Sequence, residues 1–179
     1  MVRSKSKTSV IYLVGMPGSG KTTLGKQLAQ KLNYEFKDLD HVLEEEEGRT
    51  IPEIFEVDGE ETFRKIEKRI VEGSTSWKHV VIATGGGAPC FFNNMAAMNK
   101  AGKTIFIDVN PSELLRRVAG KGQQGRPLFQ DKSEEELLKE IQEKYKYRLQ
   151  FYSLSDFTLS SNNIKVKDLL IVLDNDQQE

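Results

Sequence analysis

A phosphate-binding loop between a buried strand and an amphipathic helix is the feature that most constrains the fold of this chain. Residues 15–22 read GMPGSGKT and fit the pattern G-x-x-x-x-G-K-[ST], in which backbone N–H groups and a helix N-terminus bind phosphate. The apolar run VIYLV at residues 10–14 precedes the loop, and Leu24, Leu28 and Leu32 follow it at helical spacing. Strand, loop and helix therefore occur in the order that a parallel α/β nucleotide-binding fold requires.

The loop predicts an ATP or GTP site that includes a magnesium ion. Lys21 is expected to reach the β- and γ-phosphates, and the Thr22 hydroxyl is expected to ligate Mg²⁺. This pattern identifies a phosphoryl donor and leaves the acceptor open. The residues predicted to contact the nucleotide are Gly15, Pro17, Gly18, Ser19, Gly20, Lys21, Thr22 and Thr23.

Apolar, strand-like runs alternate with helical patterns along the rest of the chain. They lie at residues 10–14, around Phe36, at residues 80–83, at residues 104–109 and, more weakly, at residues 157–159. Alternation of this kind predicts a three-layer α/β fold with a parallel sheet. A chain of 179 residues is expected to form a single domain, here residues 1–179.

The composition argues against several other classes of protein. The 26 basic and 27 acidic side chains nearly cancel, so the totals predict no basic surface for nucleic acid or anionic lipid. No stretch approaches the roughly 20 apolar residues of a membrane span. Cys90 is the only cysteine, which fits a reducing compartment. We therefore expect a cytoplasmic protein without nucleic-acid or membrane partners.

The acidic partner of the magnesium ion must come from an unusual position. The strand at residues 80–83 ends in Thr84 and three glycines, where an Asp is ordinarily expected. Asp38 and Asp40 are the best substitutes, because side chains two apart in an extended segment point the same way and ligands bind at the carboxyl ends of parallel strands. We expect both carboxylates to share a cleft with Lys21. A turn or a helix cap is the other interpretation of this pair.

Gly85, Gly86 and Gly87 also have two interpretations, a loop leaving the strand or the floor of a substrate site. Arg64 lies one helical turn from Glu67, a spacing that is typical of a surface ion pair but also able to steady a functional arginine.

Two further arginines occupy positions suited to anions. Arg148 extends the apolar stripe of its helix, where a cation either reaches solvent or faces an anion. Arg126 follows residues 120–125, whose glycines predict a mobile segment. Closure of that segment would bring the Arg126 guanidinium to a transferring phosphoryl group.

Taken together, these features resemble shikimate kinase over nearly the whole chain. Apart from the loop, each is weak, and their order and spacing make the combination specific. The matched features are residues 15–22, Asp38-Leu39-Asp40, Phe63-Arg64 with Glu67, residues 84–87, Arg126-Pro127-Leu128, and Arg148 followed by Phe151-Tyr152.

The resemblance implies a P-loop kinase fold, with a five-stranded parallel sheet flanked by helices. It also implies a substrate-binding region at about residues 40–70 and a mobile lid at about residues 118–132. The implied reaction moves the γ-phosphoryl group of ATP to the 3-hydroxyl of shikimate, in aromatic amino-acid biosynthesis, with a monomer as the active species.

The resemblance assigns substrate contacts to five residues. Arg64 and Arg148 are similar to a guanidinium clamp for the substrate carboxylate, a task that suits planar, bidentate donors. Asp40 is similar to the carboxylate that binds the substrate hydroxyls and accepts the proton of the 3-hydroxyl. Gly86 and Gly87 are similar to backbone contacts to substrate.

The remaining implied roles concern the nucleotide and the metal ion. Asp38 is similar to a water-mediated Mg²⁺ partner beside Thr22. Arg117 is similar to an arginine that stacks on adenine, with neighbouring Arg116 as the alternative, and Arg126 is similar to a lid arginine at the γ-phosphoryl group. The predicted catalytic residues are Lys21, Asp40 and Arg126.

Two alternatives carry different functions. A related kinase for another small hydroxylated acid, such as gluconate, would share the loop, but Asp38 and Asp40 together with Phe63-Arg64 disfavour it. A GTPase would carry an Asn-Lys-x-Asp guanine-binding motif, whereas Asn99-Lys100 continues with Ala101-Gly102.

Overall fold

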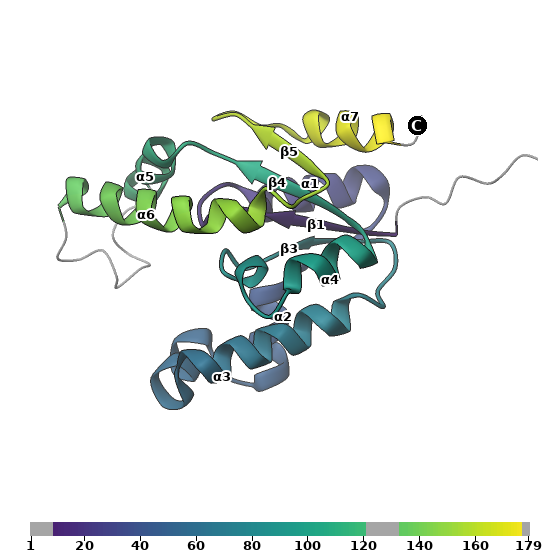
Figure 1. Cartoon of the computed structure of the whole chain (residues 1–179). Helices are drawn as coiled ribbons and strands as arrows, with labels where there is room; N and C mark the ends of the chain where they lie inside the picture. The colour runs from purple at the N-terminus through teal and green to yellow at the C-terminus, as the bar shows by residue number, and fades with distance from the viewer. Residues whose placement is uncertain (1–8, 121–132, 177–179) are drawn as a thin grey trace, which may run out of the picture.

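The computed structural model describes residues 9–120 and 133–176, and Figure 1 shows how its helices and strands are arranged. In chain order the elements are β1 (Val10–Val14), α1 (Lys21–Leu32), β2 (Glu35–Asp38), α2 (Leu39–Glu47), α3 (Ile51–Ser74), β3 (Val80–Ala83), η1 (Ala88–Cys90), α4 (Asn94–Ala101), β4 (Lys103–Asp108), α5 (Pro111–Gly120), α6 (Glu134–Tyr152), β5 (Phe157–Ser160) and α7 (Val166–Asp176). Strands and helices alternate, as the sequence predicts.

Five strands form one sheet in the order β2-β3-β1-β4-β5, and every pair of neighbours is parallel. The predicted five-stranded parallel sheet is confirmed. β1 lies in the centre, where Tyr12 pairs with Ile82 of β3 and with Thr104 of β4. The carboxyl ends of β1 and its two neighbours therefore meet at one edge of the sheet, which is where open α/β sheets bind ligands.

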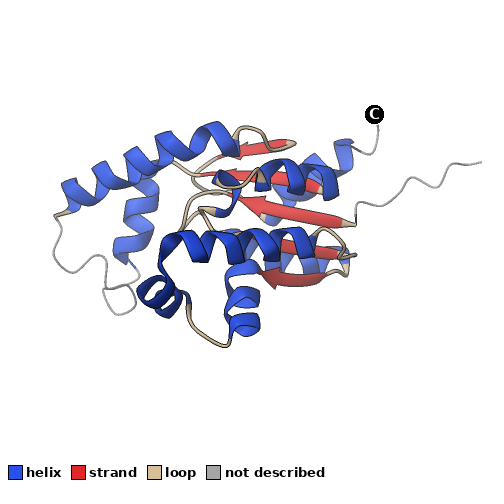
Figure 2. Ribbon diagram, turned by 60° about the horizontal axis from the view of Figure 1, so that its bottom comes forward, coloured by secondary structure: helices blue, strands red, loops and turns tan. Residues whose placement is uncertain are grey.

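Helices cover both faces of the sheet, as Figures 1 and 2 show. Side chains of β1 alternate between the faces, because successive Cβ atoms of a strand point in opposite directions. The Tyr12 hydroxyl lies 2.9 Å from Ser74 Oγ of α3 on one face. Leu13 packs against Gly25 of α1 on the other face. Every residue of β1 is buried, which explains its continuous apolar sequence.

Two capping boxes begin the helices that carry the predicted clamp arginines. Ser133 and Glu136 form one box at the start of α6, and Thr50 and Glu53 form another at the start of α3. α3 is two helices merged across a kink at Gly59, which has φ 78°. The kink separates the N-terminal part of α3 from the part that carries Arg64.

The second strand differs from the sequence-based expectation at its carboxyl end. We expected an extended segment through Asp40, but β2 ends at Asp38 and α2 begins at Leu39. The Asp38 side chain accepts the Asp40 N–H and caps the new helix, which supports the alternative interpretation of the Asp pair. Within residues 9–120 and 133–176, no helix has both the length and the apolar character needed to cross a membrane.

Candidate active site

The phosphate loop connects the end of β1 to the start of α1. Gly15 has φ 144°, and a Cβ atom there would lie 2.6 Å from the Ile107 carbonyl oxygen, so the loop requires glycine at this position. Lys21 is buried, and its Nζ donates to the Gly15 carbonyl at 2.9 Å and to the Met16 carbonyl at 3.0 Å. The lysine charge is thereby held inside the curl of the loop.

The N-terminus of α1 is suited to an anion. Among the described residues, no side chain caps this end of the helix, and its first turn contains no acidic residue. The exposed N–H groups and the positive end of the helix dipole therefore face the loop without an internal counter-charge. The buried Ser19 hydroxyl likewise has no hydrogen-bond partner among the described residues. These features fit the phosphate groups of a nucleotide.

Thr22 and Asp38 come together across the ends of α1 and β2. Thr22 Oγ1 donates to Asp38 Oδ2 at 2.9 Å, and Asp38 Oδ1 accepts the Asp40 N–H at 3.2 Å. A hydroxyl and a carboxylate beside a phosphate loop are hard oxygen ligands of the type that Mg²⁺ prefers. The pair fits the predicted metal position.

Asp40 lies in the first turn of α2 and reaches the site from there. The prediction that Asp40 belongs to an extended segment is wrong. Its Oδ1 would lie 2.6 Å from a Cβ atom at Gly85, so the carboxylate packs directly on the glycine backbone. Burial raises the pKa of Asp40, and nearby Asp38 raises it further, while Lys21 and Arg64 act in the opposite direction. The effect of Lys21 on this pKa supports the prediction that Asp40 and Lys21 share a cleft.

Arg64 and Glu67 form an ion pair that is largely removed from solvent. Arg64 Nη1 lies 2.7 Å from Glu67 Oε2, and the two side chains are only 13% and 5% exposed. The interpretation as an ordinary surface ion pair is therefore wrong for this pair. Burial raises the pKa of Glu67, and the Arg64 charge opposes that shift. The guanidinium rests on Gly87, where a Cβ atom would lie 2.7 Å from Nη1.

Arg148 reaches the neighbouring glycine from α6. A Cβ atom at Gly86 would lie 2.9 Å from Arg148 Nη1 and 2.7 Å from Cδ of Pro17 in the phosphate loop. The three successive glycines thus allow close approach by Asp40, Arg148 and Arg64 in turn. Of the two interpretations of these glycines, this packing supports the floor of a site.

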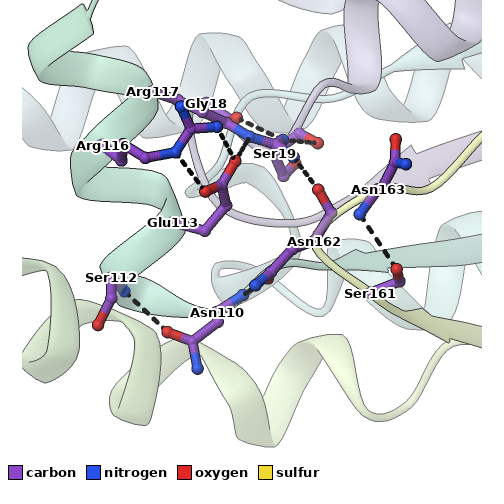
Figure 3. Close-up of polar contacts among 10 residues, drawn as sticks. All are labelled: Gly18, Ser19, Asn110, Ser112, Glu113, Arg116, Arg117, Ser161, Asn162 and Asn163. Atoms are coloured by element: carbon purple, nitrogen blue, oxygen red, sulfur yellow. Dashed lines mark hydrogen bonds and ion pairs between the residues drawn. The ribbon is translucent and has the colours of Figure 1, made fainter.

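Arg117 joins α5 to the phosphate loop. Figure 3 shows its guanidinium donating to the Gly18 and Ser19 carbonyls at 3.3 and 3.1 Å, while Nε donates to Glu113 at 2.8 Å. Arg116 also pairs with Glu113 but is 75% exposed, against 25% for Arg117. Hydrogen bonds from both arginines lower the pKa of Glu113 to about 2.

A cavity of about 720 Å³ lies beside this part of the phosphate loop. Its volume is in the range of small-molecule sites, and its position suits the base and sugar of a nucleotide. Sequence analysis assigned no role to residues 164–166, which approach the loop only through folding. The lining residues are Gly18, Ser19, Gly20, Thr23, Leu24, Gln27, Val109, Arg116, Arg117, Ile164, Lys165 and Val166.

Sequence analysis also assigned no role to Tyr152. Its hydroxyl donates to the Gly86 carbonyl at 2.5 Å and lies 3.8 Å from Met16 Sδ, so it connects the glycine floor with the phosphate loop. Two sequence signals were available: the place of Tyr152 among the features shared with shikimate kinase, and its seventh position after Tyr145 on the apolar stripe of the helix. That spacing predicts burial and gives no partner.

Other predictions concern residues outside the site or outside the described residues. Arg126 and most of the predicted lid, residues 121–132, lie outside the described part of the chain, so their roles stay predictions. Asn99 lies within α4, where it donates to the Leu154 carbonyl and accepts from Thr104 Oγ1. It is thus a structural residue, which argues against the guanine-binding interpretation. Burial raises the pKa of the Cys90 thiol to about 11, as is typical of a structural cysteine.

A parallel sheet with a phosphate loop at its central strand, facing a floor of glycines flanked by two arginines and an aspartate, defines a small-molecule kinase of the P-loop class. Residues 17–172 match the family model described as shikimate kinase. A shikimate kinase of Bacteroides thetaiotaomicron is 42% identical over 155 residues, which cover 87% of this chain and 88% of that protein. The chain belongs to the shikimate kinase family, and the resemblance inferred from its sequence is confirmed.

Solved structures agree with this assignment. A crystal structure of shikimate kinase from Bacteroides thetaiotaomicron has a TM-score of 0.87 and 39% identity, covering 92% of this chain and 98% of that chain. Shikimate kinase from Acinetobacter baumannii in complex with shikimate has a TM-score of 0.81 and 34% identity, covering 97% of each chain. A gluconokinase from Sinorhizobium meliloti 1021, at 16% identity and a TM-score of 0.59, shares the fold alone.

Proposed function

We propose that the protein transfers the γ-phosphoryl group of ATP to the 3-hydroxyl of shikimate, giving shikimate 3-phosphate and ADP. The observation that carries this proposal is the position of two guanidinium groups, Arg64 at Gly87 and Arg148 at Gly86, on a floor that touches Pro17 of the phosphate loop. Paired arginines bind a carboxylate well because each offers two parallel N–H donors. An acid bound there lies next to the phosphate groups of the donor.

Lys21 and the N-terminus of α1 are proposed to hold the β- and γ-phosphates. Phosphoryl transfer needs little covalent chemistry from the protein, so positioning and charge stabilisation supply most of the acceleration. Thr22 and Asp38, whose oxygens lie 2.9 Å apart, are proposed to hold Mg²⁺. When bound, this ion neutralises charge on the phosphate groups. Arg117 is proposed to contact adenine, because it lies on the cavity beside Gly18 and Ser19.

Asp40 is proposed to orient the substrate hydroxyl and accept its proton. Burial brings its pKa closer to neutrality, which makes the carboxylate a better proton acceptor at working pH. Gly85, on which it packs, keeps side-chain atoms away from the position of the hydroxyl. Substrate contacts are proposed for the Gly86 and Gly87 backbone on the same grounds.

Two further parts of the proposal rest on the family, and two rest on the composition. Arg126 is proposed to meet the γ-phosphoryl group, and the active species is proposed to be a monomer. The near balance of 26 basic and 27 acidic residues supports small molecules as partners in place of nucleic acid. A cytoplasmic location is proposed because a single cysteine fits a reducing compartment.

The test measures ADP release from MgATP with shikimate, with gluconate or without an acceptor. ADP release should depend on shikimate, and phosphorus–proton correlation spectra of the product should place the phosphate on C3. The methyl ester of shikimate is the matched control, because it keeps the hydroxyls and removes the charge that the arginines bind. Equal turnover with shikimate and gluconate would contradict the proposal.

A further inference from the structure

Phe91 packs on Arg64 from a segment outside the helix that carries this arginine. The Phe91 ring centroid lies 4.2 Å from the guanidinium carbon, closer than the ring of neighbouring Phe63 at 4.9 Å. We propose that Phe91 is a positioning residue for carboxylate recognition, because its ring holds the plane of the Arg64 guanidinium against Gly87. The inference rests on the proposed function and adds to it a residue that sets the geometry of the clamp.

In-plane ion pairs and a stacked ring constrain different motions of a guanidinium. Glu67 binds Nη1 at 2.7 Å and fixes one edge of the group. Glu60, whose side chain is 60% exposed, lies 3.3 Å from Nη2 and draws the other edge toward solvent. Glu60 also lies 3.3 Å from Nε, but an exposed ion pair restrains the plane of the group only weakly. A ring on the face of the group opposes rotation of this plane, and the attraction is stronger where water is excluded.

The backbone directly after Phe91 has an unusual conformation. Phe92 and Asn93 both have left-handed conformations, with φ 49° and 61°, which bulky side chains rarely adopt. Such strain persists where surrounding contacts determine the conformation, and it is concentrated at functional sites. The buried Asn94 side chain donates to the Ala88 carbonyl at 3.0 Å and closes the turn.

The turn sends two adjacent aromatic side chains in different directions. Phe91 lies on the clamp arginine, whereas Phe92 is 49% exposed with Lys68 5.8 Å from its ring centroid. Phe92 is therefore a matched control for Phe91, because it is the adjacent phenylalanine and lies beside Lys68 in place of Arg64.

The experiment compares Phe91→Leu, Phe91→Tyr and Phe92→Leu by steady-state kinetics. Phe91→Leu should raise the KM for shikimate by about 3- to 30-fold, with kcat and the KM for ATP changed by less than about twofold. Phe91→Tyr keeps the aromatic face and should restore the KM, and Phe92→Leu should leave all three constants unchanged. Thermal unfolding checks that each variant is folded. If Phe91→Leu does not fold, Phe91→Met replaces it.

A double-mutant cycle then tests whether Phe91 acts through Arg64. In an Arg64→Ala background, Phe91→Leu should have no further effect on the KM for shikimate. A full additional increase there, an unchanged KM in Phe91→Leu alone, or a failure of Phe91→Tyr to restore it would each overturn the inference. Failure of the proposed function is a different result, since the wild-type protein would then release ADP without requiring shikimate.

Discussion

Removal of one hydroxyl group, in Tyr152→Phe, should weaken substrate binding through the glycine floor. The Tyr152 side chain is fully buried, its ring packs on Phe106 with centroids 4.9 Å apart, and its hydroxyl donates to the Gly86 carbonyl. Burial raises the pKa of Tyr152, so the hydroxyl stays protonated and able to donate at neutral pH. The variant keeps the ring and leaves the Gly86 carbonyl without this donor.

The size of the effect follows from the partial burial of this bond. A partly buried carbonyl that loses this donor costs up to about 1–3 kcal/mol of stability, and each kcal/mol lowers the Tm of a domain of this size by about 2–4 °C. Gly86 also packs on Pro17 and Arg148, so a shift of its carbonyl moves the floor relative to both. If the net contribution of the bond, about 0.5–1.5 kcal/mol, is lost from binding, kcat/KM for shikimate falls about 2- to 12-fold.

Tyr12→Phe is the matched control for this measurement. Tyr12 is also fully buried, and its hydroxyl lies 2.9 Å from Ser74 Oγ, in the middle of β1 and away from the glycine floor. Thermal unfolding and shikimate kinetics should be measured on both variants. Both should lower the Tm, and only Tyr152→Phe should lower kcat/KM. An equal fall in kcat/KM in the two variants would refute the reasoning, and so would a lower Tm with an unchanged kcat/KM in Tyr152→Phe.

Four other perturbations test the site. Arg64→Ala should raise the KM for shikimate by about 30- to 1000-fold, which corresponds to roughly 2–4 kcal/mol for the loss of a desolvated charge partner. Arg69 is an exposed arginine on the same helix, so Arg69→Ala should leave the KM unchanged. Similar KM values for the two variants would contradict the clamp. Asp40 is proposed to accept a proton as a carboxylate, and its pKa is raised, so kcat/KM should fall as the pH decreases through a pKa above that of an ordinary carboxyl. A pH profile of kcat/KM that stays flat down to about pH 4 would exclude Asp40 as the proton acceptor. Because the pKa of Asp40 is higher in the folded than in the unfolded chain, its ionised carboxylate destabilises the folded state at any pH above the pKa of the unfolded chain. Asp40→Asn removes this charge, so it should raise the Tm at neutral pH while reducing kcat. Gly15→Ala should abolish ATP binding, as measured by calorimetry, because its Cβ atom would lie 2.6 Å from the Ile107 carbonyl oxygen at a φ of 144°.

Features encoded within a few neighbouring residues were predictable from the sequence. The phosphate loop is one, since its glycines, Lys21 and Thr22 lie within eight residues between a recognisable strand and helix. The capping box of Ser133 and Glu136 is another, because both partners lie in one helical turn. The Asp38 and Asp40 prediction shows the limit of local patterns. The pattern located the segment, but only the structure distinguishes a longer strand from a helix cap, because it shows the Asp38 side chain accepting the Asp40 N–H at the start of α2.

Burial and partners across elements could not be predicted from spacing. Arg64 and Glu67 have the spacing of a surface ion pair, and only the packing of α3 on the glycine floor removes them from solvent. Arg116 and Arg117 are adjacent in sequence, and the fold turns only one of them to the phosphate loop.

The sequence by itself determined the fold class, the donor site and the family of this protein, because periodicity and motif spacing are local properties of the chain. Only the tertiary structure showed which further side chains pack on the proposed acceptor site, namely Phe91 on Arg64 and Tyr152 on Gly86. Those contacts join residues from different elements, and their geometry depends on how helices pack on the sheet. The physical reason is that side-chain burial and close approach of backbone are set by the whole core, which no short segment encodes.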